Sequence, residues 1–381
     1  MNIVMCATFL QGGAGRVIYD LSNGLYRRGH RVLIFASKTE YQGYEHYEEY
    51  LQGLEAQDIR VLLCDSTFKR DIYQNINASM ALRQLLIKED IDVVHSHAAV
   101  PSMVAMIARS GLNRYIPILQ TMHGWGTNKT PEQKKMDIFL LNCVDKVITV
   151  SQGDFLLLES LGVQATNIKI IYNGIPDQCS NMPEYDDLDW QRLISLKQSG
   201  VKIIGCIGTI GKRKNQALLI SALKKIPPDR GKVIAVFIGD GNIEKLCQFA
   251  NETGVGDKVV FTGYKKEASR FLKLIDILVL PSVSEGLPLS LVEGMREKVI
   301  RVGSNIPGIN EVIADGETGF LFPSGDADSL ARVLIHVLEM DDAEKKRIID
   351  KAYADFKARF TLDKMISCHL DLYNEMLNRR I

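Results

Sequence analysis

The sequence has no long run of apolar residues and no excess of charge of either sign. No stretch reaches the roughly 18 apolar residues that a membrane-spanning helix requires. In 381 residues, 46 lysines and arginines balance 46 aspartates and glutamates. A neutral chain argues against a nucleic-acid-binding protein, because such proteins usually carry a basic surface. Any phosphate-binding or membrane-binding site must therefore be a local feature.

Cysteines are few and follow no pairing or metal-binding pattern. The seven cysteines are scattered without a C-x-x-C spacing, which fits a reducing compartment better than a disulfide framework. Residues 1–10 are a short apolar segment without the basic region and cleavage site of a signal peptide. We therefore expect a cytoplasmic protein, and peripheral contact with the inner face of the membrane stays open.

The length predicts two domains, and the pattern along the chain locates them. Strand-like apolar runs alternate with helix-like runs in both halves, which predicts the α/β class with parallel sheets covered on both faces. Between the halves the chain becomes polar and acidic. We place the N-terminal domain at 1–176, a linker at 177–198 and the second domain at 199–360, followed by a terminal helix at 361–381.

Two carboxylates, Glu285 and Glu293, mark the most informative stretch. Glu285 and Gly286 follow the strand-like run Ile277 to Leu280, and Glu293 lies in a helix-like run from Leu289 to Arg296. A strand–loop–helix turn exposes backbone N–H groups that can bind phosphate oxygens. The carboxylates can accept hydrogen bonds from sugar hydroxyls on either side of that phosphate. The pattern indicates a nucleotide-sugar ligand.

Glycine-containing turns open both halves of the chain. Residues 11–16 (QGGAGR) follow the first strand, and residues 207–215 (IGTIGKRKN) follow the first strand of the second half. Three cations beside the second turn could neutralise a pyrophosphate. An ordinary tight turn and a solvated basic loop are the alternative interpretations. Residues 35–38 (FASK) lack the acidic residue of a dinucleotide site, which argues against a dehydrogenase.

Histidines lie where strands are expected to end. His95 and His97 close one strand-like run, and His123 follows another. Ligand sites of open α/β sheets lie at the carboxyl ends of strands. The i, i+2 histidine pair could also bind a metal. No nearby carboxylate has metal-ligand spacing, so we expect no metal site.

In this order the motifs resemble the retaining glycosyltransferases of family 4, which have the two-domain GT-B fold. The match runs nearly end to end, and the ordered set is specific although each piece alone is weak. The matching pieces are Gly12, Gly13, Arg16 and Val17; 25–32; 92–97; 121–124; 147–151; 173–175; Ile207, Gly208 and Lys214; 239–241; 260–263; Pro281 and Ser282; Glu285 and Glu293; 305–308; Glu311; and 316–319.

The resemblance implies two Rossmann-like, doubly wound domains that face a central cleft, with the helix at 361–381 crossing back to the first domain. The resemblance also implies roles for four catalytic residues. His123 should lie near the anomeric centre, and Glu285 should contact hydroxyls of the transferred sugar. Lys214, with Arg213, should neutralise the leaving diphosphate.

The resemblance further assigns the donor-binding positions. Glu293 should bind the ribose hydroxyls, and Tyr264 should hold the base through its backbone. The remaining donor-binding residues are Gly13, Gly208, Gly286, Leu287, Pro288 and Leu289. His97 and Arg16 are expected on the acceptor side.

The implied reaction transfers a hexose or N-acetylhexosamine from a nucleoside-diphosphate sugar, foremost a UDP-sugar, to an acceptor hydroxyl with retention of configuration. The acceptor would be a saccharide or lipid-linked saccharide in polysaccharide, lipopolysaccharide or glycolipid biosynthesis. No metal cofactor is expected, because fixed cations and helix dipoles replace it. Two alternatives stay open: a GT-B-like nucleotide-sugar epimerase or hydrolase, and a non-catalytic nucleotide-sugar-binding homologue.

Some positions depart from the family pattern. Thr209 stands where arginine is frequent, and Lys212 or Arg213 can substitute for it. Gly294 and Arg296 stand where the family usually has alanines. A glycine within a helix costs about 1 kcal/mol relative to alanine.

Overall fold

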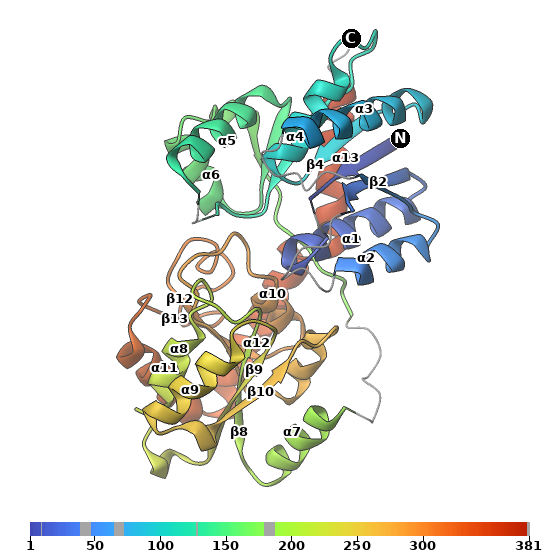
Figure 1. Cartoon of the computed structure of the whole chain (residues 1–381). Helices are drawn as coiled ribbons and strands as arrows, with labels where there is room; N and C mark the ends of the chain where they lie inside the picture. The colour runs from blue at the N-terminus through green and yellow to red at the C-terminus, as the bar shows by residue number, and fades with distance from the viewer. Residues whose placement is uncertain (9, 39–46, 65–71, 127–128, 179–186, 379–381) are drawn as a thin grey trace. The chain divides into compact units, whose positions relative to one another are not determined.

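The computed structural model describes residues 1–8, 10–38, 47–64, 72–126, 129–178 and 187–378 (Figure 1). The chain divides into two compact units. The first comprises Met1–Pro176 together with Thr361–Ile381, and the second comprises Asp177–Phe360.

The first unit is built on a seven-stranded sheet in the order β3-β2-β1-β4-β5-β6-β7, and every neighbouring pair is parallel. The strands are β1 Asn2–Cys6, β2 Arg31–Ser37, β3 Arg60–Cys64, β4 Val93–Ser96, β5 Ile118–Met122, β6 Lys146–Thr149 and β7 Ile168–Ile170. The central strands β4, β5 and β6 are buried at every residue. Burial on both faces explains their continuous apolar pattern.

Helices cover the two faces of this sheet. They are α1 Gly12–Arg27, α2 Tyr47–Glu55, α3 Ile72–Lys88, α4 Ala99–Arg109, α5 Pro131–Cys143, α6 Gln152–Ser160 and α13 Leu362–Asn378, with a short 3-10 helix at Ala165–Asn167. Helices α3 to α6 contribute to one core with the sheet through Leu82, Val104, Leu141 and Leu158.

The terminal helix α13 belongs to the first unit and packs on α1 (Figure 1). A Cβ at Gly24 would lie 2.0 Å from Cδ1 of Ile366, so the two helices touch where α1 has no side chain. Arg28 and Asp363 form an ion pair at 2.7 Å. The chain therefore completes its first unit with its last helix.

The second unit has a six-stranded sheet in the order β10-β9-β8-β11-β12-β13, again parallel throughout. The strands are β8 Lys202–Ile207, β9 Val233–Ile238, β10 Val259–Gly263, β11 Ile277–Leu280, β12 Ile300–Ser304 and β13 Phe320–Phe322. The helices are α7 Leu188–Gln198, α8 Gln216–Leu223, α9 Ile243–Thr253, α10 Leu289–Arg296, α11 Ala327–Glu339 and α12 Asp342–Arg359. Short 3-10 helices lie at Pro228–Arg230, Gly256–Lys258 and Ala268–Leu274.

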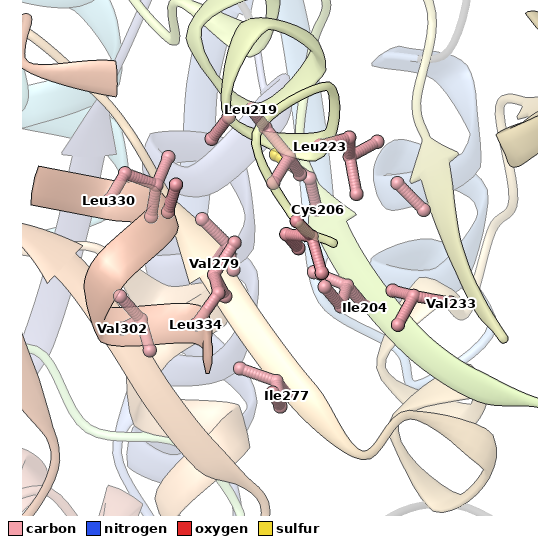
Figure 2. Packing of buried hydrophobic residues seen from close by; sticks show 14 of the residues in the cluster. Ile204, Cys206, Leu219, Leu223, Val233, Ile277, Val279, Val302, Leu330 and Leu334 are labelled. Atoms are coloured by element: carbon pink, nitrogen blue, oxygen red, sulfur yellow. The ribbon is translucent and has the colours of Figure 1, made fainter. Parts of the chain in front are cut away.

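One face of the second sheet packs on α8, α9 and α11. Figure 2 shows Leu219 and Leu223 of α8 and Leu330 and Leu334 of α11 over the buried strand residues. The strand residues labelled there are Ile204, Cys206, Val233, Ile277, Val279 and Val302. This core fixes β8 and β11, the two strands whose loops carry the charged residues described below.

The predicted linker at 177–198 requires a correction, because its last residues form α7. Asp187 caps this helix by accepting hydrogen bonds from the backbone N–H groups of Asp189 and Trp190. The Trp190 ring is buried and packs edge-on against Phe271, with centroids 5.4 Å apart. The helix is therefore part of the second unit. Residues 179–186 of the linker lie outside the described residues.

In each sheet the strand order reverses beside the first strand, between β1 and β4 and between β8 and β11. Ligands of open α/β sheets bind outside the carboxyl ends of the strands at such reversals. Both predicted clusters of polar residues follow these strands. Among the described helices, none combines the length and the apolar character needed to cross a membrane.

Candidate functional site

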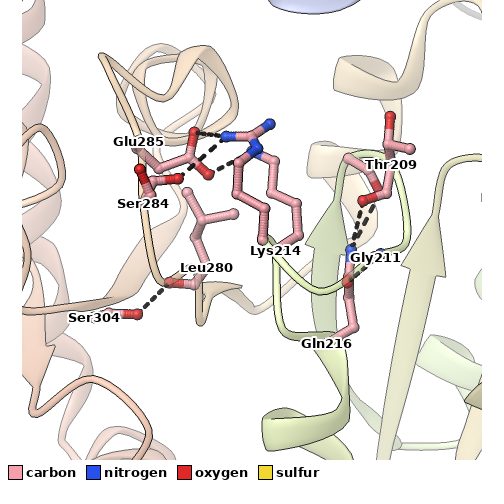
Figure 3. Close-up of polar contacts among 10 residues, drawn as sticks. Thr209, Gly211, Lys214, Gln216, Leu280, Ser284, Glu285 and Ser304 are labelled. Atoms are coloured by element: carbon pink, nitrogen blue, oxygen red, sulfur yellow. Dashed lines mark hydrogen bonds and ion pairs between the residues drawn. The ribbon is translucent and has the colours of Figure 1, made fainter. Parts of the chain in front are cut away.

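A three-residue ion cluster lies where the second sheet reverses. Arg213 and Lys214 come from the loop after β8, and Glu285 comes from the loop after β11. Arg213 Nη1 lies 2.9 Å from Oε2 of Glu285, and Lys214 Nζ lies 2.9 Å from Oε1. Figure 3 shows the Lys214 side chain directed at the Glu285 carboxylate. One carboxylate thus holds two cations, and the cluster keeps one positive charge in excess.

The members of this cluster differ in their access to solvent. The side chains of Glu285 and Lys214 are 6% and 13% exposed, whereas that of Arg213 is 52% exposed. Burial alone would raise the pKa of Glu285, but Lys214 and Arg213 outweigh burial and hold this pKa below its usual range. Glu285 is therefore ionised at neutral pH, and Arg213, which also donates to the carbonyl of Ser284 at 3.2 Å, is the more exposed cation of the cluster.

The loop that carries the cations is held by Gln216, which sequence reasoning missed. The buried Gln216 amide donates to the carbonyl of Thr209 at 3.1 Å and accepts from the N–H of Gly211 at 3.2 Å (Figure 3). Asn215 adopts a left-handed conformation, with φ of 52°, just before α8. The side chain of Gln216 thus bridges Thr209 and Gly211 within this turn. A glutamine at the start of an apolar helix was the only sequence signal.

Glycines allow the neighbouring loops to approach this turn closely. A Cβ at Gly239 would lie 2.4 Å from the carbonyl oxygen of Gly208. A Cβ at Gly308 would lie 2.2 Å from the carbonyl oxygen of Gly286. The glycine motifs at 239–241 and 305–308 therefore support the loops after β8 and β11.

Helix α10 begins directly after the Glu285 loop. Its N-cap residue is Pro288, and no side chain caps its first turn. The first backbone N–H groups of α10 therefore receive no side-chain cap, and such groups can bind phosphate oxygens. Gly286 and Leu287 lie just before this helix start, and Leu289 is the first residue of the helix. Glu293 lies one turn further along α10 and is half-buried.

Tyr264 directly follows β10, next to these loops. The carbonyl of Gly263 accepts a hydrogen bond from the N–H of Gly239 at 2.9 Å, which joins the carboxyl ends of β9 and β10. The structure therefore places all the donor-binding residues predicted in the second half at the carboxyl edge of one sheet. Their contacts with a ligand stay a prediction.

The first unit holds a buried histidine cluster at the ends of β4 and β5. Nδ1 of His97 lies 3.0 Å from Nε2 of His123, and the two rings are stacked. The rings of His95 and His97 are tilted by 35° to one another, with centroids 4.2 Å apart. Burial holds the pKa values of His95 and His97 well below their ordinary value and lowers that of His123 to about 4. All three rings are therefore neutral at pH 7.

The terminal helix α13 closes this cluster. Tyr373 Oη lies 2.7 Å from Nδ1 of His95, whose Nε2 lies 2.7 Å from Oγ1 of Thr121. The ring of His369 lies beside that of His95, tilted by 36°, with centroids 5.4 Å apart. Tyr373 is 278 residues from His95 in the chain. No local spacing in the sequence could therefore indicate these contacts.

The other two residues predicted in the first unit lie on α1. Gly13 is exposed at the start of this helix, where the N-cap residue Gln11 makes no side-chain cap. Arg16 forms an ion pair with Asp20 one turn along the helix, at 2.6 Å. His97, predicted on the acceptor side, is only 9% exposed and bonds to His123. An acceptor contact of Arg16 or His97 stays a prediction.

Packing explains the departure at Gly294. A Cβ at this position would lie 2.7 Å from Cδ2 of Leu278 and 3.1 Å from Cγ and Cδ of Arg301. Arg301 is fully buried on β12 and donates hydrogen bonds to the carbonyls of Val312 and Thr318. Glycine on α10 therefore makes room for a buried arginine on the neighbouring strand.

Two family models together match most of the chain. Residues 11–178 match Glycosyltransferase Family 4, and residues 190–355 match Glycosyl transferases group 1. The two matched segments correspond to the two units described above. They therefore connect each of the two clusters to a glycosyltransferase domain.

Two curated proteins are similar in sequence over most of their length. The chain is 25% identical to N-acetyl-alpha-D-glucosaminyl L-malate synthase of Bacillus anthracis, over 96% of this chain and 94% of that protein. It is 24% identical to UDP-Gal:alpha-D-GlcNAc-diphosphoundecaprenol alpha-1,3-galactosyltransferase of Escherichia coli, over 79% of this chain and 81% of that protein.

Solved structures share the fold. The crystal structure of Anabaena HepE in complex with UDP and glucose superposes with a TM-score of 0.82 at 20% identity, covering 98% of this chain and 100% of that chain. Sucrose-phosphate synthase from Thermosynechococcus elongatus gives a TM-score of 0.80 at 18% identity, covering 100% of both chains. With its two Rossmann-like units and both family models matched, the chain belongs to the GT-B glycosyltransferases of the family 4 type.

Proposed function

We propose that this glycosyltransferase moves a hexose or N-acetylhexosamine from a nucleoside-diphosphate sugar, foremost a UDP-sugar, to an acceptor hydroxyl with retention of configuration. The observation that carries the proposal is the Glu285 carboxylate with Arg213 and Lys214 on its two oxygens. The cluster combines an excess positive charge for a diphosphate with carboxylate oxygens for sugar hydroxyls. Both lie beside the uncapped start of α10.

The electrostatics of Glu285 support a hydroxyl-binding role rather than a proton-transfer role. A carboxylate whose pKa is lowered by two cations is a weak base and a weak nucleophile. We therefore assign Glu285 to the hydroxyls of the transferred sugar. The leaving phosphate oxygen then takes the proton of the acceptor hydroxyl on the same face of the sugar. The O–C bond to the acceptor forms as the bond to phosphate breaks, which retains the anomeric configuration.

We assign the leaving diphosphate to Lys214 and Arg213. Preorganised cations and backbone N–H groups stabilise charge that develops in the transition state without further reorganisation. Because two fixed cations already face this position, we propose that no divalent metal takes part. Turnover should be unchanged after treatment with EDTA, and restoration of lost activity by Mg²⁺ or Mn²⁺ would contradict this point.

The remaining assignments follow the family pattern. We assign the ribose hydroxyls to Glu293, the base to the backbone of Tyr264, and a hydrogen bond to the transferred sugar to His123. UDP is favoured because HepE was crystallised with UDP and glucose, and the E. coli relative is named for UDP-Gal. Saccharides or lipid-linked saccharides of polysaccharide, lipopolysaccharide or glycolipid biosynthesis are the proposed acceptors, on the cytoplasmic face of the membrane.

A thermal-shift screen of UDP-, GDP-, ADP- and dTDP-sugars tests the donor. A ligand at about 100 times its Kd stabilises the native state by about 2.7 kcal/mol, which is a readily measured increase in Tm. We expect the largest increase with UDP-sugars, and a smaller one in Lys214→Met. An increase for none of these sugars would contradict the proposal. Conversion of the bound sugar without an acceptor would instead favour an epimerase or hydrolase.

A further inference from the structure

The His97–His123 contact restricts how both rings carry their protons. A neutral imidazole has one N–H donor and one bare nitrogen acceptor. Nδ1 of His97 and Nε2 of His123 are 3.0 Å apart, so one of them must donate to the other. The other two nitrogens, Nε2 of His97 and Nδ1 of His123, are buried and have no hydrogen-bond partner among the described residues. One of these two must therefore carry an unsatisfied N–H.

The two nitrogens are both buried, but the two residues differ in exposure. His97 is buried at 9% exposure, whereas His123 is half-buried at the end of β5. Unsatisfied buried donors are rarer in proteins than unsatisfied acceptors. The cheaper arrangement leaves a bare nitrogen on the deeper residue and places the N–H on the residue nearer the surface.

His97 is itself held rigidly. Its backbone N–H donates to the carbonyl of Cys6 at 2.9 Å, and its ring lies against the ring of His95. His95 is fixed from two sides by Thr121 and Tyr373. Both ring nitrogens of His95 bond to Tyr373 and Thr121 and neither bonds to His97, so this cluster orients rings and does not conduct a proton from α13 to His123.

We propose that His97 is a positioning residue: it donates from Nδ1 to Nε2 of His123 and thereby fixes the ring plane and the tautomer of His123. The proton of His123 then lies on Nδ1, as a donor for an oxygen atom of the glycosyl donor. This assignment of a ligand rests on the proposed function, whereas the tautomer is a property of the protein alone.

Nitrogen-15 NMR of protein labelled selectively at histidine tests the tautomer without any substrate. In wild type we expect His123 to be protonated on Nδ1. In His97→Asn we expect His123 to keep this tautomer, because the asparagine amide can still donate a hydrogen bond to Nε2 of His123. In His97→Leu the preference should be lost. Protonation of His123 on Nε2 in wild type, or an unchanged tautomer in His97→Leu, would overturn the proposal. If His97→Leu does not fold, a changed tautomer in His97→Asn overturns it.

Tyr373→Phe is the matched control. It removes a hydrogen bond to His95 in the same cluster but leaves the His97–His123 contact intact, so the tautomer of His123 should not change. A change there as large as in His97→Leu would show that any loosening of the cluster suffices, which also overturns the proposal.

Kinetics then test the consequence for transfer. We expect kcat to fall about 10- to 100-fold in His97→Leu, as for a small misplacement of a group at a reacting centre, with unchanged affinity for the free nucleotide. His97→Asn should recover most of the loss. His97→Leu combined with His123→Ala should be no slower than His123→Ala alone. An additive loss in the double variant would overturn the positioning role. Absence of transfer in wild type would instead contradict the proposed function and leave the NMR result standing.

Discussion

The Glu285 carboxylate pairs with two cations, Arg213 and Lys214, whereas an ordinary surface ion pair has one cation for each carboxylate. Exposed pairs contribute little because solvent screens them, but Glu285 and Lys214 are largely buried. The excess positive charge is thus retained in a protected position where a diphosphate would balance it. Both residue types and their chain positions were predictable from sequence. Their mutual contact was not, because it depends on the adjacency of β8 and β11.

At the residue scale, Glu293→Ala should raise the KM for the nucleotide-sugar. Loss of a charge-assisted hydrogen bond to a ribose hydroxyl costs roughly 1.5–3 kcal/mol, which corresponds to about a 10- to 150-fold change. Steady-state kinetics with the best donor measure it, and Glu297→Ala, at the C-terminal end of the same helix, is the control. An unchanged donor KM in Glu293→Ala would remove Glu293 from the ribose site.

The buried histidines predict a pH dependence of stability. Burial holds the pKa values of His123 and His369 at about 4, whereas an unfolded histidine titrates near 6.5. Between these values the unfolded state binds more protons, so the free energy of unfolding falls as pH falls from about 6.5 toward 4. Each histidine contributes up to ~1.4 kcal/mol per pH unit.

Urea unfolding at pH 7 and pH 5 measures this effect. The matched variant is His369→Gln, which keeps a polar group beside the Met365 carbonyl that His369 Nδ1 contacts at 2.8 Å but cannot titrate. It should lose part of the pH slope. Equal slopes in wild type and variant would show that His369 is not a source of the dependence.

At the element scale, loop–loop packing positions the site more than any single helix does. At Gly239 and Gly308 the backbone lies so close to the carbonyl oxygens of Gly208 and Gly286 that no side chain would fit between them. The helix α10 was predicted with its observed bounds, because its apolar spacing and the preceding strand are local signals. Helix α7 was not predicted, because its acidic N-terminal residues suggested a linker. The role of Gln216 could not be predicted from sequence either, because it depends on the conformation of the turn to which its side chain bonds.

The substitution Gly294→Ala tests whether the packing of α10 on β12 requires glycine at this position. Alanine gains about 1 kcal/mol in helix propensity, but its Cβ would overlap Leu278 and Arg301. Overpacking costs typically 1–3 kcal/mol, so we expect a net loss of stability in denaturant unfolding. Gly211→Ala is the control, because a Cβ there meets nothing within 4 Å. A more stable Gly294→Ala would contradict the packing explanation.

At the scale of the whole molecule, the two units repeat one design. Each sheet has its first strand at the reversal of strand order, and a glycine-containing turn follows that strand. The fold class was predictable because continuous apolar strands alternate with helices in both halves. The histidine cluster was only partly predictable, since its closure by Tyr373 and His369 depends on the return of α13 to the first unit.

Deletion of residues 362–381 should therefore destabilise the first unit and spare the second. The deletion removes the buried side chains of Ile366, Leu372, Tyr373 and Met376 and exposes α1. Hydrogen–deuterium exchange should show lost protection in 1–176 and retained protection in the strands β8 to β12. Equal loss in both units would contradict the assignment of α13 to the first unit.

The most direct test of the central claim is the mass of the product formed from a nucleotide-sugar and a panel of saccharide and lipid-linked saccharide acceptors. The account predicts an acceptor heavier by one hexosyl or N-acetylhexosaminyl residue, with release of the nucleoside diphosphate. Lys214→Met should form this product at least ~10-fold more slowly, as expected for loss of a charge-assisted contact. Lys224→Met, at an exposed lysine that ends α8, should match wild type. Equal rates in wild type and Lys214→Met would contradict the account.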